Sequence, residues 1–382
     1  MTGNPVGTPI PASGNEGRSL GEDTAALLSW YAANRRILPW REDPAPYHVW
    51  LSEIMLQQTK VEAAEGYYAR FMKELPDIPA LAASDEELCL KLWEGLGYYS
   101  RVRNLRRAAI IVCGKYGGVL PDTAEELVKL PGIGRYTASA IASIACGRKC
   151  PAVDGNLLRI FARVTGYEEN IRTDEAYRQA CSFYLMMMDS VDPEACPTDN
   201  PYGDINQALM DLGAKVCIPR GTPDCGCCPL SRSCRAHLEN RTEELPRAAG
   251  TKQRRAEDRT VFILRSADRV AVRKRPPKGL LAGLYEFPNV PGHLTGEEAL
   301  EYLKERKLPA VWIRPAGDAR HVFSHVEWNM TGYEVRIDEF PENGAEGDGL
   351  IYISAAELEE RYPVPEAFRA YRKLIVQERI RK

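Results

Sequence analysis

Two glycines separated by one apolar residue constrain this chain most, because they directly precede a run of small residues. Gly132 and Gly134 lie in the segment 130–138, which reads LPGIGRYTA, and the small residues continue to position 145. Glycine permits a tight turn and a close approach of another molecule to the backbone. Such a turn at a helix start points backbone N–H groups outward and can seat a phosphate. An ordinary helical hairpin is the alternative.

The length of the chain predicts more than one domain, because 382 residues exceed what a single hydrophobic core supports. A hydrophobic content of 44% and a charged content of 27% are typical of soluble globular proteins. No apolar run is long enough to span a membrane. Residues 1–22 lack the apolar core of a signal peptide and are expected to form a disordered tail.

The net charge of −3 does not by itself indicate a nucleic-acid-binding protein. Any binding to DNA must then come from local basic patches, since the overall charge sets only the far field. One candidate patch consists of Arg101, Arg103, Arg106 and Arg107. A solvated helix face is the alternative interpretation of these arginines.

Five of the eleven cysteines fall within eighteen positions, and four of them are spaced like metal ligands. The order is Cys217-x7-Cys225-x2-Cys228-x5-Cys234, with Cys227 as an additional thiol. Four thiolates at short, loop-compatible spacings suit a [4Fe–4S] cluster or a structural zinc. Without a secretory signal, a metal site is favoured over disulfides. The spacing does not separate iron–sulfur from zinc, and Cys227 competes with Cys228 as the third ligand.

The patterning divides the chain into a helical part and an α+β part. Residues 23–238 are expected to form an all-α domain, with a helical hairpin over about 123–145 and the spaced cysteines in a loop at 217–234. Residues 239–258 are polar and charged, which indicates a linker. Residues 259–382 are expected to form an α+β domain. The expected helices are 24–31, 84–96, 105–116 and 123–130, with capping boxes at Ser84 and Thr123, and the expected strands are 260–265, 270–274, 333–337 and 349–353.

Two carboxylates are candidates for acid–base chemistry. Glu53 stands among Trp50, Leu51, Ile54 and Met55, an apolar setting that would raise the pKa of its carboxyl group, as a general acid requires. A Glu on the polar side of an amphipathic helix is the alternative. Asp154 lies in a second tight turn, Val153-Asp154-Gly155-Asn156, where it could act beside a bound backbone or only cap a helix.

These residues resemble the adenine DNA glycosylases of the MutY type, within the helix-hairpin-helix superfamily that includes endonuclease III. The resemblance runs from about residue 24 to 370. The motifs that carry it are LPWR at 38–41, SEIMLQQT at 52–59, GLGYYSR at 95–101, LPGIGRYTA at 130–138, VDGN at 153–156, HVFSH at 321–325 and the cysteine cluster.

The resemblance implies an enzyme that flips adenine out of duplex DNA, where it lies opposite 8-oxoguanine or guanine, and hydrolyses its N-glycosidic bond. Glu53 would protonate the adenine at N7. Asp154 would stabilise the positive charge that builds at C1′, either electrostatically or through a transient covalent bond. Asn156 would support the site beside Asp154.

Tyr136 separates two branches of this superfamily. In the endonuclease III branch, this position carries the lysine that forms a Schiff base and then cleaves the strand. A phenol cannot form a Schiff base, so a monofunctional glycosylase without an efficient lyase step is expected. Tyr136 would instead help to position Asp154 and the sugar.

The same resemblance implies the contacts to DNA. Gln58 and Tyr98 would enter the duplex around 8-oxoguanine, because an amide bonds to base edges and a flat ring stacks. Core packing is the alternative for Tyr98 and its neighbour Tyr99, and at least one of the two is expected to be core. The complete set of expected DNA and substrate contacts is Trp40 and Arg41 at the adenine pocket, Gln207 on the flipped base, Gln58, Thr59, Leu96 and Tyr98 in the duplex, and Gly132 and Gly134 at the backbone.

The C-terminal domain resembles the Nudix fold, but it lacks the Arg-Glu-x-x-Glu-Glu run of the Nudix box. Without those carboxylates, no Mg²⁺-dependent pyrophosphate hydrolysis is expected. Ser324, between Phe323 and His325, would instead read 8-oxoguanine at N7–H and O8. A β-turn with a buried Phe and two polar flanks is the alternative.

The family usually has six residues in the first cysteine gap, whereas this chain has seven. A [4Fe–4S] cluster on Cys217, Cys225, Cys228 and Cys234 is nevertheless implied, with structural zinc as the alternative. Two rival functions are a bifunctional pyrimidine-lesion glycosylase and a catalytically silent iron–sulfur DNA-binding protein. We expect a monomer in the bacterial cytoplasm, at the nucleoid, with double-stranded DNA as its partner.

Overall fold

The computed structural model describes residues 19–193, 196, 198–248, 250, 254–308, 310–340 and 349–380. They form two compact units, one of Met1–Glu53 with Leu120–Gly250 and the other of Ile54–Val119 with Thr251–Lys382. Positions 1–18 of the tail expected over residues 1–22 lie outside the described residues. Positions 20–22 are helical, because Ser19 caps a helix that starts at Leu20. Among the described helices, none combines the length and apolar character needed to cross a membrane.

The first unit is helical. Its elements are α1 (Leu20–Asn34), α2 (Pro39–Glu42), α3 (Pro46–Leu56, up to Glu53), α8 (Ala124–Leu127), α9 (Arg135–Ala140), the π-helical turn η1 (Ile141–Ala145), α10 (Gly155–Thr165), α11 (Asp174–Asp189), α12 (Pro201–Lys215), the 3-10 turn η2 (Cys225–Cys227) and α13 (Arg235–Leu238). Buried side chains of α1, α10, α11 and α12 share one core, which includes Leu27, Leu157, Met187 and Leu209. This core holds the start of α10, where Asp154 lies.

The second unit combines helices with a mixed sheet. Its helices are α4 (Val61–Glu74), α5 (Ile78–Ala83), α6 (Glu86–Leu92), α7 (Ser100–Tyr116), α14 (Gly296–Glu305), α15 (Ala355–Glu360), the 3-10 turn η3 (Glu366–Phe368) and α16 (Arg369–Ile380). Its strands are β1 (Arg255–Ser266), β2 (Arg269–Lys274), β3 (Tyr285–Glu286), β4 (Asn289–Pro291), β5 (Ala310–Val322), β6 (Val326–Ile337) and β7 (Leu350–Ser354). The strand order is β3-β2-β1-β6-β5, with β4 on β1 and β7 on β2.

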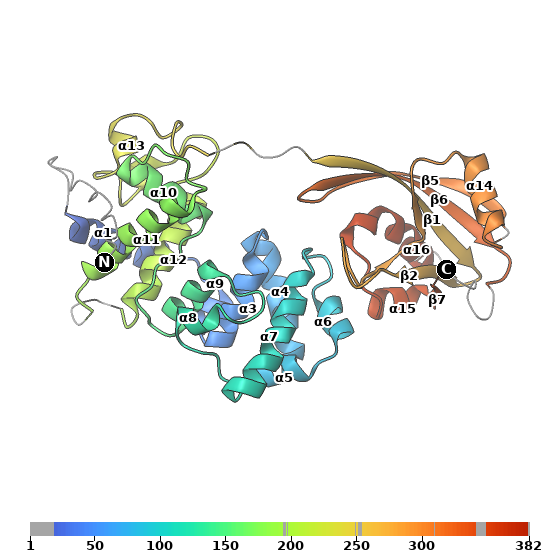
Figure 1. The fold of residues 1–382 in the computed structure, drawn as a ribbon, viewed down its shortest axis with the longest axis horizontal. Coiled ribbons are helices and arrows are strands. Elements are labelled where there is room, and N and C mark those ends of the chain that lie inside the picture. Colours follow the sequence, from blue (N-terminus) through green and yellow to red (C-terminus); the bar gives the residue numbers. More distant parts are fainter. Residues whose placement is uncertain are drawn as a thin grey trace, which may run out of the picture. The chain divides into compact units, whose positions relative to one another are not determined.

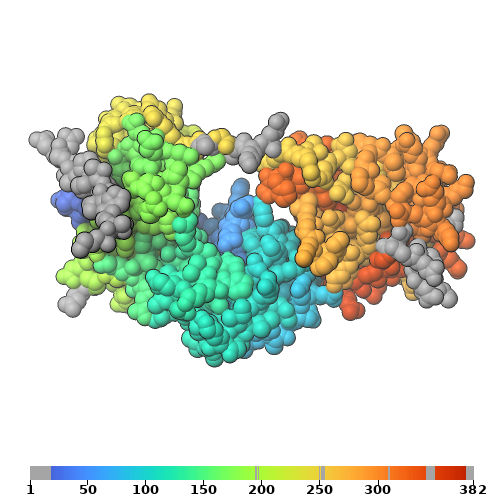
Figure 2. Space-filling model, viewed as in Figure 1, coloured from blue at the N-terminus to red at the C-terminus, as the bar shows by residue number. Residues whose placement is uncertain are grey.

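Both faces of this sheet are covered, as alternating side chains of β1 show. Val261 and Ile263 pack with residues of α15 and α16, whereas Phe262 and Leu264 pack with residues of α14. Successive strand residues point to opposite faces, so an unbroken apolar run is what a strand between two helical layers requires. β1 pairs in parallel with β6, and the other pairs are antiparallel. Figure 1 shows the sheet with α14 and α16, and Figure 2 shows the same residues in orange and red as a packed surface.

The helical first part and the α/β second part confirm the fold class expected from the patterning. The helix starts differ in detail: Ser84 ends α5, and Asp85 caps α6 by accepting from the Leu88 N–H. Thr123 precedes α8 without a side-chain cap. The capping boxes expected at Ser84 and Thr123 are therefore both wrong: a short helix ends at Ser84, and the Thr123 side chain accepts no hydrogen bond from the first turn of α8. The strand β5 was not expected from the sequence, since its side chains are largely exposed and show no apolar pattern.

Candidate functional site

Glu53 is a buried carboxyl group on α3 with a tyrosine as its hydrogen-bond donor. The residue is only 6% exposed, and the Tyr136 hydroxyl donates to its Oε2 at 2.7 Å. The pKa of Glu53 is raised to about 7, because burial and the nearby charge of Asp154 outweigh the lowering by the Tyr136 hydrogen bond and by Arg41. The carboxyl group is therefore half protonated near neutral pH, the condition in which a general acid works best.

Asp154 is the N-cap of α10. Its Oδ1 accepts from the N–H groups of Asn156 at 2.8 Å and Leu157 at 2.9 Å, and its Oδ2 accepts from the Asn156 side-chain amide at 2.9 Å. Burial raises the pKa of Asp154, and these donors counteract the rise. The helix-cap interpretation is thus realised. The same donors hold the carboxylate in one orientation, which a charge-stabilising group also needs.

Tyr136, in the first turn of α9, connects the turn at 130–134 to Glu53. The residue is half-buried, and the desolvation of its phenol together with the charges of Glu53 and Asp154 raises its pKa well above the ordinary value. The hydroxyl therefore stays protonated and donates to Glu53. The sequence-based expectation placed Tyr136 as a support for Asp154. In the structure the hydroxyl donates to the other carboxyl group, that of Glu53, and its role toward Asp154 and the sugar stays a prediction.

Arg41, expected at the adenine pocket, forms a buried ion pair. Its Nη1 lies 2.8 Å from Oδ2 of Asp211, and its Nη2 lies 3.0 Å from Oδ1 of the same residue. Arg36 also pairs with Asp211, which holds the pKa of that aspartate below its usual range. Trp40 precedes Arg41 on α2 and is 5% exposed. Sequence reasoning missed Asp211, and the only signal was a carboxylate within an otherwise apolar helical stretch.

One face of α12 joins these groups. Gln207, Met210 and Asp211 are three and four positions apart and so lie on the same side of the helix. Met210 Sδ lies 3.9 Å from the Tyr136 hydroxyl, and Asp211 binds Arg41. Gln207 is 9% exposed. Within the described residues its amide makes no hydrogen bond, so the donor and acceptor remain available for a ligand.

A buried arginine links Asn156 to the cysteine loop. Arg159 Nη2 donates to Oδ1 of Asn156 at 3.0 Å and to the Gly213 carbonyl at 2.8 Å. Its Nε donates to the Cys217 carbonyl at 2.9 Å. The cysteine loop and the α10 N-terminus therefore share one hydrogen-bonded support.

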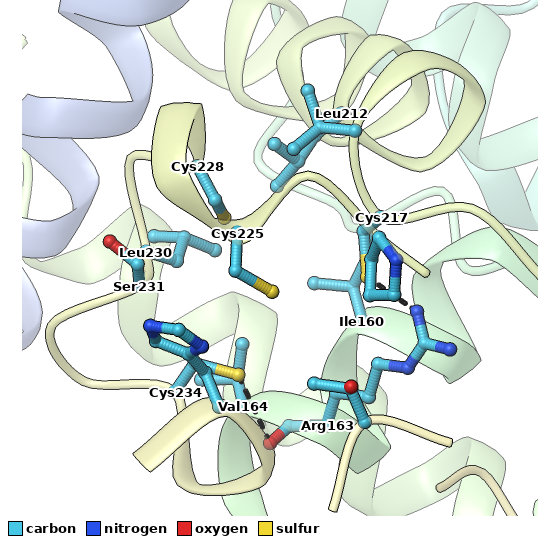
Figure 3. A pocket seen from close by; sticks show the side chains of 14 residues that line it. Ile160, Arg163, Val164, Leu212, Cys217, Cys225, Cys228, Leu230, Ser231 and Cys234 are labelled. Atoms are coloured by element: carbon cyan, nitrogen blue, oxygen red, sulfur yellow. Dashed lines mark hydrogen bonds between the residues drawn. The ribbon is translucent and has the colours of Figure 1, made fainter. Parts of the chain in front are cut away.

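Four cysteines line one cavity in the first unit, as Figure 3 shows. They are Cys217, Cys225, Cys228 and Cys234, with Ile160, Leu212 and Leu230 among their apolar neighbours. Arg163 Nη1 lies 3.2 Å from Cys217 Sγ. Cys227 is exposed and does not line the cavity. Cys228, rather than Cys227, therefore lies with the other three cysteines, and its role as a ligand stays a prediction.

The glycine turn leads into a helix start without a side-chain cap. Gly132 has a φ of 80°, the left-handed region that glycine adopts without strain. Gly134 is the N-cap residue of α9, and no side chain accepts from the first turn. This is the local arrangement expected where backbone N–H groups bind a phosphate, and the binding of a phosphate here remains a prediction.

In the second unit, some of the residues expected to contact the DNA duplex are exposed and others are buried. Gln58 is exposed and Tyr98 is 45% exposed, whereas Leu96 is 8% exposed and Tyr99 is 5% exposed. Thr59 is half-buried. Tyr99 is thus the core residue of the pair and Tyr98 the accessible one, as expected for a ring that stacks on bases.

Phe323, Ser324 and His325 form the tip of the β5–β6 hairpin. The Phe323 N–H donates to the Val326 carbonyl at 2.8 Å, and its half-buried ring packs edge-on against Trp328. Ser324 and His325 are exposed, and the Ser324 hydroxyl lies 3.2 Å from His325 Nδ1. The β-turn interpretation describes this geometry, and the two polar side chains remain accessible at the tip.

Comparison with known proteins gives consistent matches. Residues 51–184 match the HhH-GPD superfamily of base excision DNA repair proteins, and residues 260–374 match the NUDIX domain. The chain is 34% identical over 384 residues to the adenine DNA glycosylase of Homo sapiens, covering 84% of this chain and 68% of that protein. It is 33% identical over 329 residues to the adenine DNA glycosylase of Buchnera aphidicola, covering 86% and 90%. A solved thermostable thymine-DNA glycosylase aligns with a TM-score of 0.48 at 25% identity, covering 56% and 95%.

Proposed function

The chain belongs to the adenine DNA glycosylase family, and on that premise we propose that it excises adenine paired with 8-oxoguanine through Glu53 and Asp154. Members of this family bind DNA and remove adenine in base excision repair, and this chain is a DNA glycosylase of that kind. The observation that carries the assignment of the acid is the buried Glu53, held by Tyr136 beside Asp154.

Glu53 acts as the general acid. With its pKa near 7, a large fraction of the side chain carries a proton that it can give to N7 of a flipped adenine. The C1′–N9 bond then breaks with its electron pair on the base, which leaves as neutral adenine. The oxygen of a water molecule then bonds to C1′. The proton that this water releases goes to the Glu53 carboxylate, which restores the acid.

Asp154 stabilises the sugar while its bond to the base breaks. Its two oxygens accept three hydrogen bonds at the start of α10, which orients a negative group before the positive charge develops at C1′. Gln207 reads the flipped base, because its amide is free and lies on the α12 face that contacts Tyr136 through Met210. Trp40 and Arg41 form the wall of the pocket.

The enzyme has no efficient lyase step. Tyr136 occupies the position where the bifunctional branch carries a lysine, and its phenol stays protonated because it is buried. This favours the monofunctional reaction over the rival bifunctional pyrimidine-lesion glycosylase. The rival silent DNA-binding protein is disfavoured by the buried Glu53 and by Asp154, whose charge acts on it.

The four cavity cysteines would hold a [4Fe–4S] cluster. Cys217, Cys225, Cys228 and Cys234 line one cavity, and such a cluster takes one thiolate at each of its four corners. Four thiolates also suit a structural zinc, and the family resemblance favours the cluster. When bound, the cluster would brace the loop that Arg159 connects to Asn156.

The hairpin tip at Phe323, Ser324 and His325 reads 8-oxoguanine on the strand opposite the adenine. Ser324 offers a hydroxyl that both donates and accepts, which suits the N7–H donor and O8 acceptor of the oxidised base. The Gly132–Gly134 turn binds a DNA phosphate, and Gln58 and Tyr98 enter the duplex. The protein acts as a monomer.

A gel assay on a labelled duplex with adenine opposite 8-oxoguanine tests this proposal. We expect strand cleavage only after alkali treatment, because excision leaves an intact abasic site. Cleavage without alkali, together with a borohydride-trapped covalent complex, would establish the bifunctional rival. Binding without any abasic product would establish the silent binder. A parallel duplex with thymine opposite 8-oxoguanine is the control for adenine specificity.

A further inference from the structure

Arg101 is a buried cation whose partners are backbone carbonyl groups. It lies in the first turn of α7, is 8% exposed, and forms no ion pair with any described carboxylate. Its two terminal nitrogens contact five carbonyl oxygens at 2.6–3.1 Å, those of Ile54, Met55, Gln57, Leu96 and Gly97. The sequence interpretation of Arg101 as part of an exposed basic patch is therefore wrong, because its charge is turned inward.

The five carbonyls come from two segments far apart in the sequence. Nη1 contacts the last turn of α3 and the residue before Gln58, whereas Nη2 contacts the two residues before Tyr98. The last carbonyls of a helix lack partners within the helix, and a cation stabilises that end. One guanidinium thus completes the end of α3 and ties it to the 96–98 loop.

The residues that follow these carbonyls are strained and accessible. Gln58 has a φ of 59° and Tyr98 a φ of 47°, values that L residues rarely adopt. Such a backbone is unfavourable and persists only where the surroundings enforce it. The two side chains themselves are exposed, so the enforcement acts on their backbone. The Arg101 guanidinium also lies over the rings of Trp93 and Tyr98, at 5.3 and 5.6 Å from their centroids.

We propose that Arg101 is a positioning residue that locks the Gln58 and Tyr98 loops into one rigid unit, so that both side chains enter the duplex together. The inference rests on the proposed role of these two side chains in DNA. Arginine suits the task because its planar fork presents two terminal nitrogens in fixed directions, whereas lysine offers a single ammonium that cannot span both loops. The lowered pKa of Arg101, about 10 because of burial, still leaves it charged at neutral pH.

The test measures base flipping directly. Duplexes carry 2-aminopurine beside an adenine opposite guanine, and the protein carries Glu53→Gln so that the base is not removed. Fluorescence rises when the adenine leaves the stack. We expect Arg101→Lys to reduce the fluorescence response roughly tenfold, equivalent to about 1.4 kcal/mol, and to change affinity for a fully paired duplex less than threefold, since backbone contacts persist.

A double-mutant cycle separates positioning from a general structural role. Tyr98→Ala should reduce flipping strongly when Arg101 is present and little further when Arg101 is already lysine. If the two substitutions instead reduce flipping by independent factors that multiply in the double variant, the proposal is overturned. The matched control is Arg265→Lys, which alters another sheltered arginine of the same unit, one paired with Glu334 at 2.9 Å, and should leave flipping unchanged.

A second measurement needs no variant and covers the case in which Arg101→Lys does not fold. Hydrogen–deuterium exchange of the unmodified protein should show the segments 54–59 and 95–100 opening together, because one side chain joins them. Independent opening rates would overturn the proposal. Adenine excision by the unmodified protein tests the proposed function separately: excision without coupling removes only the Arg101 inference, and coupled flipping without excision removes only the proposed chemistry.

Discussion

The Tyr136 hydroxyl donates a 2.7 Å hydrogen bond to Glu53, a residue 83 positions earlier in the chain. This bond joins the end of the glycine turn to the candidate acid. It opposes burial, which raises the pKa of Glu53 to about 7. The tyrosine therefore limits how far burial raises the pKa of this carboxyl group, and so reduces the fraction that is protonated at neutral pH.

Replacement of the acid should abolish most of the chemistry. Glu53→Gln keeps the shape of the side chain and an oxygen that can accept from Tyr136, but it cannot release a proton. We expect single-turnover excision to fall by about 10²–10⁴-fold, the range typical of a lost general acid. Affinity for the mispaired duplex should change little. Substantial remaining excision would show that another group is the acid.

The pH profile should depend on Tyr136. Because the protonated form of Glu53 is active, excision should decrease as the pH rises through about 7. Tyr136→Phe removes the hydrogen bond that lowers this pKa, so the alkaline limb should move to higher pH by about one to two units. Single-turnover rates between pH 5 and 9 measure the shift, with Tyr116→Phe as the control. An unmoved limb would assign the titration to another group.

The same pKa predicts a pH-dependent stability difference. The folded-state pKa of Glu53 lies above the unfolded value of 4.5, so its contribution is greatest below pH 4.5 and is lost as the pH rises through 7. The loss approaches about 3 kcal/mol on an order-of-magnitude basis. The free energy of unfolding of Glu53→Gln, taken relative to that of the unmodified protein, should therefore be higher at pH 8 than at pH 5. Denaturation midpoints at both pH values measure this, and an equal difference at both would contradict it.

The hairpin tip should control the choice of opposite base. Ser324→Ala removes one hydrogen-bonding group, which is worth about 0.5–1.5 kcal/mol. The preference for 8-oxoguanine over guanine should therefore fall by roughly two- to tenfold, while adenine excision opposite guanine stays the same. Thr331→Ala, which alters an exposed hydroxyl on β6, is the control. Unchanged discrimination would place the reader elsewhere.

The two neighbouring thiols should differ in iron content. Cys228 lines the cavity and Cys227 is exposed. Cys227→Ser should retain about four irons per chain, whereas Cys228→Ser should lose most of them. Elemental analysis of the purified variants measures iron and zinc together. If Cys228→Ser retains its iron and Cys227→Ser loses it, the ligand assignment is reversed. If the protein contains zinc and no iron, the site is a zinc site and the proposed cluster is wrong.

Local patterns in the sequence predict local structure well in this chain. The apolar run from 260 to 265 predicts β1, and the alternation of helical and strand patterns predicts the two kinds of fold. The capping box at Ser84 fails because two short helices meet there, which residue preferences alone do not distinguish. β5 escapes prediction because an edge strand with exposed side chains has no apolar period to detect.

The sequence by itself determined the chemical inventory: the two carboxyl groups, the tyrosine in place of a lysine, four spaced thiols and the family to which they belong. Only the tertiary structure decided which groups meet. It directed the Tyr136 hydroxyl to Glu53, placed Cys228 rather than Cys227 at the cavity and turned Arg101 inward. The physical reason is that burial and charge are supplied by segments far apart in the chain, and a pKa or a hydrogen bond depends on those neighbours rather than on spacing.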